Sequence, residues 1–402
     1  MNIPRPQKPY VFHPPKYSPW LMPVLHRVAE HFYMRRKFKI REVRERGIGK
    51  VVQRVGEGHS VLVAPNHADH ADPSLLLHLG KRHRLPFHFM AAREGFERGR
   101  LAAAVLQRCG AFSVDREGAD LAAIKMAMSL LQACRYPLVI FPEGEIWHHH
   151  ESLDALNDGV ATILLRAAAK LPEGRKAFLV PAAIRIGHDP GVEQSFSARL
   201  SRLEQRVLWK PRPERNAVDR IHRLGAGLLA LKEEEHLGRA QTGSLPERIA
   251  GLREALVTAM EEKHAVTPDK PGMPERIKLL RGRLRKHLLD GEAAASPALH
   301  AALYDDLDTL YLASQLYSYP GQYLRENPSL DRVAETILKL EEDVLEEEEY
   351  VGPRCADVSF DEPVDVAAFL ESRSLTVKTG VRPLTQWLGE RIQALIDAGT
   401  VS

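Results

Sequence analysis

The sequence predicts an α/β fold in which a mostly parallel sheet is flanked by helices, with an N-terminal amphipathic helix and a C-terminal all-helical extension. Apolar runs of strand length recur between residues 60 and 190, at 61–64, 87–91, 111–114, 138–141 and 178–186. Segments with helical spacing of apolar residues lie between them, most clearly 120–133 and 159–169. Strands that alternate with helices are typical of a parallel sheet. Because ligands of such sheets bind at the carboxyl ends of the strands, the residues just after each run are the candidates for function.

Composition indicates a globular protein without a nucleic-acid partner. The chain has 402 residues, 44% of them hydrophobic and 27% charged, and its net charge is only +3. Its three cysteines show no C-x-x-C spacing and cannot all pair, which favours a reducing compartment, so a cytoplasmic location is expected. No uncharged apolar run reaches the ~18 residues needed to span a bilayer, and the first residues lack the apolar core of a signal peptide. Any membrane association is therefore expected to be peripheral, on the cytoplasmic face.

Residues 1–50 are expected to form an extended arm followed by an amphipathic basic helix. Residues 1–19 are rich in proline, which favours extended backbone. Apolar residues at helical spacing then lead into a basic cluster, namely Trp20, Leu21, Val24, Leu25, Val28 and Phe32 followed by Arg35, Arg36, Lys37, Lys39, Arg41, Arg44 and Arg46. Such a segment suits the interface of an anionic leaflet, where each cation contributes about 1 kcal/mol. It equally suits a helix packed on the core with a solvated basic end, and the sequence leaves both open.

The first candidate site follows the apolar run 61–64. It contains His67 and, five residues later, Asp72, at a point where a strand is expected to end and a helix to begin. A carboxylate at this spacing can hold the imidazole, which sets its tautomer and makes the other ring nitrogen a better base. His67 is therefore predicted to take a proton from a substrate hydroxyl. The alternative is a surface turn with a capping aspartate.

Three further candidate segments follow later strands. Residues 110–116 begin with Gly110 and end with Arg116, whose guanidinium offers a fork of donors that matches a phosphate. In residues 141–145, Glu143 could pair with Arg116 or accept a substrate hydroxyl, and Gly144 permits close approach of backbone to a ligand. In residues 180–184, Pro181 interrupts an apolar strand, which implies an edge, a bulge or a strand start beside a lipid pocket.

Together these four segments resemble the motifs of the glycerophospholipid acyltransferase superfamily, which contains the 1-acyl-sn-glycerol-3-phosphate acyltransferases. The family motifs are N-H-x4-D, G-x-F-x-x-x-R, F-P-E-G and V-P-x-x-I, in that order. In this chain they are residues 66–72, 110–116, 141–144 and 180–184. Each motif is weak alone, but four in order, each at a predicted strand, make a strong signal.

The resemblance implies a reaction and a role for each residue. His67, oriented by Asp72, would deprotonate the acceptor hydroxyl for attack on an acyl thioester of coenzyme A or acyl carrier protein, with no metal, no other cofactor and no acyl-enzyme. Arg116, in the block that begins with Gly110, would clamp the acceptor phosphate. The turn of Glu143 and Gly144 would seat the glycerol-phosphate head, and Pro181 would border the acyl groove. The acceptor implied first is a lysophospholipid, 1-acyl-sn-glycerol 3-phosphate.

The chain departs from the family after Gly144. Many members continue with Thr-Arg-Ser, whereas residues 145–150 are Glu-Ile-Trp-His-His-His. Without that arginine a phosphate contact is missing, so another lysophospholipid, glycerol 3-phosphate or a lipid without phosphate remains open as acceptor. The three histidines and Glu151 do not predict a metal site, because consecutive residues do not all point at one ion.

The predicted organisation is an acyltransferase domain at 51–240 and a helical extension at 241–402 that braces the domain or mediates assembly. A basic amphipathic segment at 275–289 suits either a membrane or acyl carrier protein, or simply a solvated helix face. Three other functions remain open. They are acyl transfer to another lipid or amine, lipid binding or scaffolding without catalysis, and hydrolysis in which His67 activates water.

Overall fold

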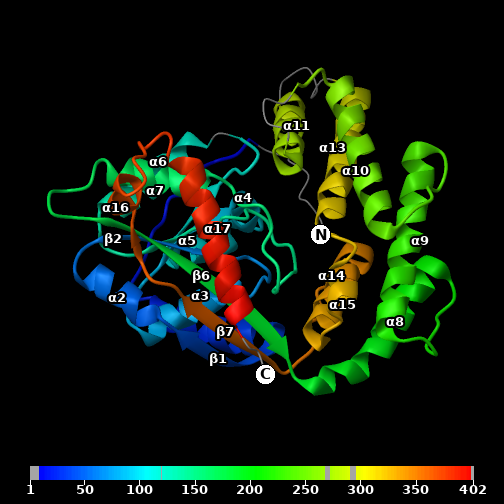
Figure 1. Ribbon diagram of the computed structural model, residues 1–402, viewed down its shortest axis with the longest axis horizontal. Coiled ribbons are helices and arrows are strands. Elements are labelled where there is room, and N and C mark those ends of the chain that lie inside the picture. The colour runs from blue at the N-terminus through cyan, green and yellow to red at the C-terminus, as the bar shows by residue number, and fades with distance from the viewer. Residues whose placement is uncertain (1–8, 119, 268–271, 290–295, 400–402) are drawn as a thin grey trace. The chain divides into compact units, whose positions relative to one another are not determined.

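In the computed structural model an eight-stranded sheet is built from the first half of the chain and from two strands near its C-terminal end (Figure 1). The strand order is β1-β7-β6-β2-β5-β3-β4, and β8 also pairs with β6. The bounds are β1 Ile40–Arg46, β2 Ser60–Pro65, β3 His88–Ala92, β4 Ala111–Val114, β5 Leu138–Val139, β6 Ala177–His188, β7 Arg354–Phe360 and β8 Val364–Asp365. All pairs are parallel except β6 with β7 and β6 with β8. The predicted α/β fold with a mostly parallel sheet is therefore confirmed.

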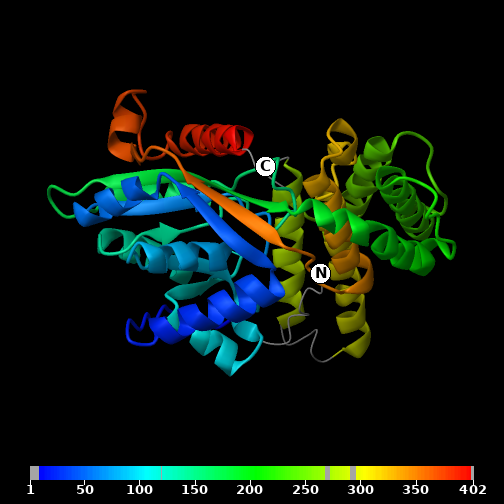
Figure 2. The ribbon, with the colours of Figure 1, turned by 90° about the horizontal axis from the view of Figure 1, so that it is seen from below.

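Helices cover both faces of this sheet. On one face α6 (Leu121–Gln132), α7 (Gly159–Ala168), α16 (Val366–Glu371) and α17 (Val381–Ala398) share one apolar core with the strands. Figure 2 shows α17 on this face and the N-terminal helices on the opposite face. Every residue of β2 is buried, as expected for an inner parallel strand covered on both sides. The remaining helices of this part are α2 (Ile48–Gly56), α3 (Asp72–Arg82), α4 (Arg93–Glu97), α5 (Arg100–Arg108) and η2 (Pro190–Val192).

The structure describes residues 9–118, 120–267, 272–289 and 296–399, which fall into two compact units. The sheet unit comprises Phe12–Asp115, Asp120–Val192 and Tyr350–Ser402, and the helical unit comprises Met1–Val11, Arg116–Ala119 and Glu193–Glu349. The helices of the latter are α8 Glu193–Leu208, α9 Ala217–Leu237, α10 Leu245–Lys263, α11 Met273–Leu289, α13 Pro297–Tyr317, α14 Tyr323–Glu326 and α15 Leu330–Leu345. Leucines of α10, α11 and α13 form its own core.

The C-terminal extension differs from the prediction. The main segment of the helical unit is Glu193–Glu349, whereas the extension is predicted from residue 241, and from Tyr350 the chain returns to the sheet unit. There it adds β7 and β8, so the extension is not all helical. The strand β7 has the sequence Arg-Cys-Ala-Asp-Val-Ser-Phe, and nearly all of it is buried. Because polar residues interrupt this strand, it lacks the apolar run by which the other inner strands were recognised.

The N-terminal helix is also shorter than predicted. It consists of α1 (Met22–Val28) and a π-helical stretch η1 (Ala29–Lys37), after which the chain enters β1. The basic residues from Arg41 to Arg46 therefore belong to an edge strand, whose outward side chains tolerate charge. Residues 9–18 have no helix or strand, as expected for the arm, whereas residues 1–8 of the arm lie outside the described residues.

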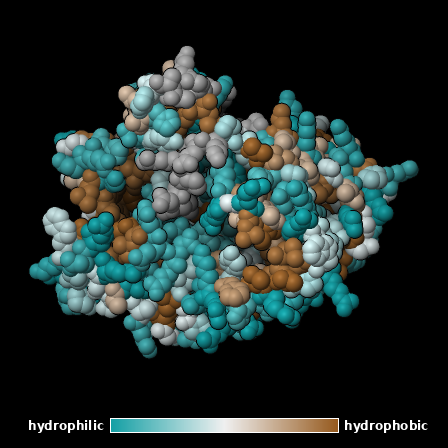
Figure 3. Space-filling view, turned by 180° about the vertical axis from the view of Figure 1, so that it is seen from behind, coloured by the Kyte–Doolittle hydropathy of each residue, from teal (hydrophilic) through white to brown (hydrophobic). Residues whose placement is uncertain are grey.

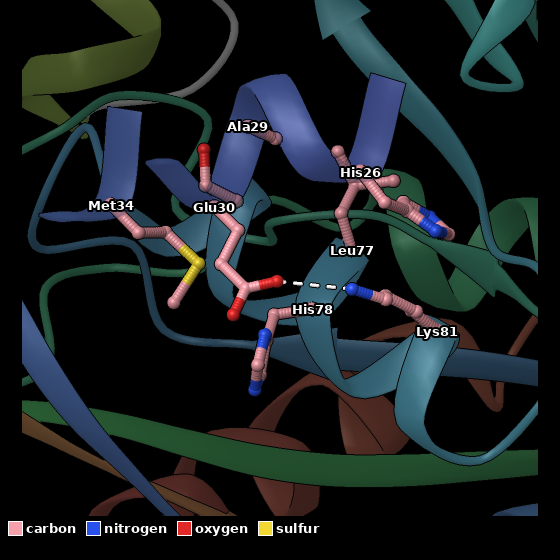
Figure 4. A pocket seen from close by; sticks show the side chains of 8 residues that line it. His26, Ala29, Glu30, Met34, Leu77, His78 and Lys81 are labelled. Carbon is pink, nitrogen blue, oxygen red and sulfur yellow. Dashed lines mark hydrogen bonds and ion pairs between the residues drawn. The ribbon is translucent and has the colours of Figure 1, made fainter. Parts of the chain in front are cut away.

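The helices α1 and η1 pack against α3, and Figure 4 shows this junction. Lys81 of α3 donates to Glu30 of η1 at 3.0 Å. Burial lowers the pKa values of His26 and His78 on the two sides, so both imidazoles are held neutral. Within the described residues, no helix is both long enough and apolar enough to cross a membrane.

Candidate active site

The loop between β2 and α3 begins at Asn66, whose side chain makes hydrogen bonds to the backbone of β6. The Asn66 amide donates from Nδ2 to the Ile184 carbonyl at 3.0 Å, and the Ile184 N–H donates to Asn66 Oδ1 at 2.7 Å. These two bonds extend the ladder between β2 and β6 by one residue. The loop that carries His67 therefore leaves the sheet from a defined point.

Asp72 gathers this loop around one oxygen. Its Oδ2 accepts from the N–H groups of Ala68 and Asp69, both at 3.0 Å, and lies 2.9 Å from His67 Nδ1. Asp72 is fully buried at the first turn of α3, where the helix dipole favours a negative charge. Because the carboxylate can only accept, Nδ1 is the protonated ring nitrogen and Nε2 carries the lone pair.

The His67 imidazole is held but remains accessible. Its ring stacks on Phe141 with centroids 4.0 Å apart and planes inclined by 22°. The side chain is 15% exposed, and Nε2 makes no hydrogen bond within the described part of the chain. The arrangement therefore presents one basic nitrogen to a ligand at the carboxyl edge of the sheet.

Glu143 holds the backbone of His67. The His67 N–H donates to Glu143 Oε1 at 2.7 Å, and the Asp154 N–H donates to Oε2 at 3.2 Å. Burial raises the pKa of Glu143 to about 8; the nearby carboxylates of Asp154 and Asp72 act in the same direction, and the two backbone donors oppose it. The structure thus brings Glu143 to His67, but with both carboxylate oxygens engaged by backbone rather than directed at a substrate hydroxyl.

Gly144 closes a tight turn beside Glu143. Its φ is +78°, and its N–H donates to the Phe141 carbonyl at 3.2 Å. Asn157 Nδ2 donates to the carbonyls of Pro142 and Glu143, and a Cβ at residue 144 would lie 2.9 Å from this nitrogen. The turn uses the Gly144 N–H for its own hydrogen bond, and the role of Gly144 in seating a glycerol-phosphate head stays a prediction.

Pro181 lies inside a continuous strand rather than at an edge, a bulge or a start. It pairs in register with Ala64 on the β2 side, and on the other side β6 changes its partner from β8 to β7 around this residue. The Pro181 carbonyl accepts from the Asp361 N–H at 2.9 Å. Because the missing N–H of proline falls at the change of partner, the strand tolerates it. Its place beside an acyl groove stays a prediction.

Gly110 and Arg116 lie at opposite ends of β4. Gly110 has φ +91° after α5, and its carbonyl accepts from His88 Nδ1 at 2.9 Å. It precedes β4, so it lies at the amino end of the strand, and this placement favours a turn residue over a substrate contact. Arg116 follows β4 at the carboxyl end, in the short segment assigned to the helical unit. Its role as a phosphate clamp stays a prediction.

Sequence reasoning missed three residues that shape the site. Phe141 was seen only as part of a motif, although an aromatic residue at a strand end is a signal for stacking. Asp69 accepts from the Ala71 N–H at 2.8 Å, as a turn residue does, but it also pairs with Arg354 at 2.7 Å. Arg354 gave no signal, because it lies 285 positions from Asp69. His148, His149 and His150, which follow the three positions where many family members have Thr-Arg-Ser, are all buried.

Residues 42–185 match the model of the family described as Acyltransferase, which is the family of the glycerophospholipid acyltransferase superfamily. The match covers less than half of the chain, and it includes β2, α3, β4 and the turn at Glu143. It confirms the resemblance that the four motifs indicate. No curated protein matches this chain.

Proposed function

Because residues 42–185 form an acyltransferase domain, we propose that the protein transfers a fatty acyl group from an acyl thioester to the hydroxyl of a lysophospholipid. The donor would be acyl-coenzyme A or acyl carrier protein, and the first acceptor 1-acyl-sn-glycerol 3-phosphate. The observation that carries the proposal is the His67–Asp72 pair, 2.9 Å apart, with Nε2 of the imidazole directed to no described group.

The chemistry assigned to this pair is general base catalysis. His67 Nε2 takes the proton of the acceptor hydroxyl while its oxygen attacks the thioester carbonyl, and the resulting imidazolium is stabilised by the Asp72 carboxylate. When the C–S bond breaks, the thiolate leaves and takes up that proton, so the base is regenerated. A positioned base contributes about 10²–10⁴-fold to the rate. Holding donor and acceptor together supplies a further share.

Arg116 is proposed as the clamp for the acceptor phosphate, and the residue that follows it packs on α11 within the helical unit. Arg281 Nη2 of α11 lies 2.5 Å from Glu117 Oε1, and Arg285 Nη1 lies 4.0 Å from the same oxygen. A Cβ at Gly282 would lie 2.4 Å from the Glu117 carbonyl oxygen, so the segment packs closely on α11. A guanidinium two residues after β4 is suited to a bidentate grip on phosphate.

We also propose that the protein lies on an anionic membrane surface through one face of the sheet unit. We use the term docking face for a set of exposed apolar residues, namely Trp20, Val24, Val28, Phe32, Leu101 and Val105. Trp20 is 76% and Leu101 79% exposed, and the start of α1 is joined to the end of α5 because Arg108 Nη1 donates to Ser18 Oγ at 2.9 Å. Figure 3 shows apolar patches among hydrophilic side chains on the face of the molecule opposite to that seen in Figure 1.

Charge around the docking face favours anionic lipid. Arg27, Arg35, Arg36 and Lys37 are exposed beside its apolar residues, and Arg36 lies over the Phe32 ring at 5.4 Å. Of the apolar residues for which the sequence leaves membrane contact and core packing open, Trp20, Val24, Val28 and Phe32 are exposed, whereas Met22 and Met34 are buried. Apolar side chains next to cations are the composition that binds the boundary between headgroups and acyl chains.

Thiol release with a panel of acceptors tests the reaction. The full-length protein is given acyl-coenzyme A or acyl carrier protein with a lysophospholipid, glycerol 3-phosphate, a lipid without phosphate, or an amine, and the acylated product is identified by mass spectrometry. The proposal expects release that depends on the lysophospholipid. Release without any acceptor would indicate a hydrolase, release with another acceptor would reassign the substrate, and no release at all would favour a binding protein.

Vesicle flotation tests the docking face. Binding to vesicles that contain phosphatidylglycerol is expected to weaken when Arg35, Arg36 and Lys37 are changed to Gln, by about 1 kcal/mol for each cation. A control variant neutralises Lys170, Lys210 and Lys232, exposed lysines on other elements, and should float like the wild type. Unaltered flotation of the first variant would contradict membrane binding through these cations and favour the alternative, a packed helix with a solvated basic end.

A further inference from the structure

Asp69 and Arg354 form a buried ion pair between the loop that carries His67 and the returning C-terminal segment. Arg354 Nη1 donates to Asp69 Oδ2 at 2.7 Å, and the side chains are only 1% and 2% exposed. The two residues are 285 positions apart, and Arg354 lies outside the part of the chain that matches the acyltransferase family.

The topology of the sheet explains how Arg354 reaches this loop. Because β7 runs antiparallel to β6, its first residue lies at the edge where the parallel strands end, opposite His188. The guanidinium is held there by two further groups. Arg354 Nε donates to the Phe38 carbonyl at 2.8 Å, and the guanidinium carbon lies 4.6 Å from the centre of the Tyr350 ring.

Asp69 connects Arg354 to the His67–Asp72 pair through hydrogen bonds. One of its carboxylate oxygens accepts from Arg354 and the other from the Ala71 N–H, while its own backbone N–H donates to Asp72 Oδ2 at 3.0 Å. That oxygen is the one that holds His67 Nδ1. A continuous series of contacts therefore runs from Arg354 through Asp69 and Asp72 to the imidazole.

The charge of Asp69 is maintained by its partner. Burial alone would raise the pKa of this carboxyl, but the Arg354 guanidinium, with smaller contributions from His150 and the Ala71 N–H, more than offsets it and holds the pKa well below its usual range. The pair is therefore ionised at neutral pH. A buried aspartate without this arginine would be left as an uncompensated charge in the middle of the loop.

We propose that Arg354 is a positioning residue for the reaction: it fixes the loop of residues 66–72 through Asp69, so that the returning segment from Tyr350 is required for full turnover. The inference rests on the proposed function, in which His67 is the base. Arg354 touches no substrate in this account. Its effect is on the geometry of the His67–Asp72 pair, where misplacement by about 1 Å is enough to slow a reaction about 100-fold.

Three full-length variants test the proposal by activity. Arg354→Met is expected to lower kcat by about 10- to 100-fold, with the KM for the acyl thioester close to that of the wild type. Arg354→Lys keeps the charge beside Asp69 but not the planar fork that also reaches Phe38, so it should recover part of kcat. Arg391→Met is the matched control. It removes a bidentate pair with Asp361 in the same returning segment, at 2.6 and 3.0 Å, without touching the loop, and should keep the wild-type kcat.

Hydrogen exchange gives a readout that needs no activity. The amides of Ala68, Asp69 and Ala71 all donate to carboxylates in the loop, so a peptide that covers residues 66–72 should exchange slowly in the wild type. Its exchange is expected to be faster in Arg354→Met, intermediate in Arg354→Lys and unchanged in Arg391→Met. If Arg354→Met does not fold, as judged by circular dichroism, Arg354→Lys carries the test.

A folded Arg354 variant with wild-type kcat and wild-type exchange in residues 66–72 would overturn the proposal. Failure of the proposed function would look different. In that case the wild type itself would release no thiol with the lysophospholipid, or His67→Ala would release it at the wild-type rate, whatever the exchange of the Arg354 variants.

Discussion

The two units of this protein both bury charged side chains, but they use them differently. In the helical unit Glu204 is fully buried against Arg220 at 2.7 Å, and Glu233 is fully buried against Arg248 at 2.6 Å. Each pair joins two segments of helical structure. In the sheet unit the buried carboxyl groups of Asp69, Asp72 and Glu143 all bind to one loop, at the edge of the sheet where the parallel strands end.

The difference lies in what the charges converge on. The pairs of the helical unit satisfy one another and leave nothing directed at a ligand, so they are best understood as links between helices. The carboxylates of the sheet unit hold the backbone and one ring nitrogen of His67, and the other ring nitrogen of that residue is exposed. Buried charge therefore marks function here only where it is organised around an accessible group. Four predictions test this comparison.

The largest effect is expected at the catalytic pair. Asp72→Asn removes the charge that stabilises the imidazolium and can present an amide N–H to Nδ1, which favours the wrong tautomer of His67. We expect kcat for thiol release to fall by about 10²–10⁴-fold while the protein stays folded by circular dichroism. A kcat close to that of the wild type would place Asp72 with the purely structural carboxylates.

In the helical unit the matching change should affect stability instead. Arg220→Met leaves Glu204 buried without its main partner, and we expect a loss of about 3–5 kcal/mol in the free energy of unfolding of this unit, measured by urea denaturation. Below the unfolding transition kcat should be retained. Lys232→Met breaks an exposed pair with Glu235 and should cost no more than about 1 kcal/mol. Loss of kcat in folded Arg220→Met would show that the helical charges also serve the site.

The ionisation of Glu143 should make the free energy of unfolding depend on pH. Burial raises the pKa of Glu143 to about 8 from an ordinary value near 4.5, so the fold favours the protonated side chain. The stabilisation that this gives is fully present below about pH 4.5 and is lost as the pH rises through about 8. Glu143→Gln cannot ionise, so its free energy of unfolding relative to the wild type should improve between about pH 5 and about pH 9, by a few kcal/mol at most.

Glu57→Gln is the control for this pH dependence. Bonds from Gln53 and Arg54 lower the pKa of the exposed Glu57, so its difference from the wild type should stay constant over the same range. A constant difference for Glu143→Gln as well would mean that Glu143 is ionised in the fold at neutral pH.

The smallest effect is expected at the turn beside Glu143. Gly144→Ala places a side chain at φ +78° and 2.9 Å from Asn157 Nδ2, which should cost about 1–2 kcal/mol in urea denaturation. Gly159→Ala is the matched control, because a Cβ there meets nothing within 4 Å at the start of α7. Equal stability of the two variants would show that the turn adapts without strain.

The parts of the fold that could be predicted are those that show a pattern within a short stretch of sequence. The strands β2 to β6 are apolar runs between segments of helical spacing, so their alternation with helices and the mostly parallel sheet follow from the sequence. β7 could not be recognised, because Arg354, Asp357 and Ser359 are buried only through pairing with strands far away in the chain. The sequence does not predict β1, because an edge strand with outward charges has no apolar run.

The candidate site divides in the same way. His67 and Asp72 are five positions apart, so their pairing was predictable from spacing, and the structure places them in hydrogen-bond distance. The backbone role of Glu143 and the turn bond of Gly144 depend on the path of the loop after β5, which residue types alone do not define. The Asp69–Arg354 pair depends on the return of the chain to the sheet unit after residue 349, and no local sequence pattern predicts that return.

The most direct test of the account is thiol release by His67→Ala in the presence of acyl thioester and lysophospholipid. The account predicts that the folded variant releases thiol about 10²–10⁴-fold more slowly than the wild type, because the base is lost while donor and acceptor are still held together. Wild-type release by His67→Ala would contradict it, and would leave the acyltransferase domain with a different catalytic group.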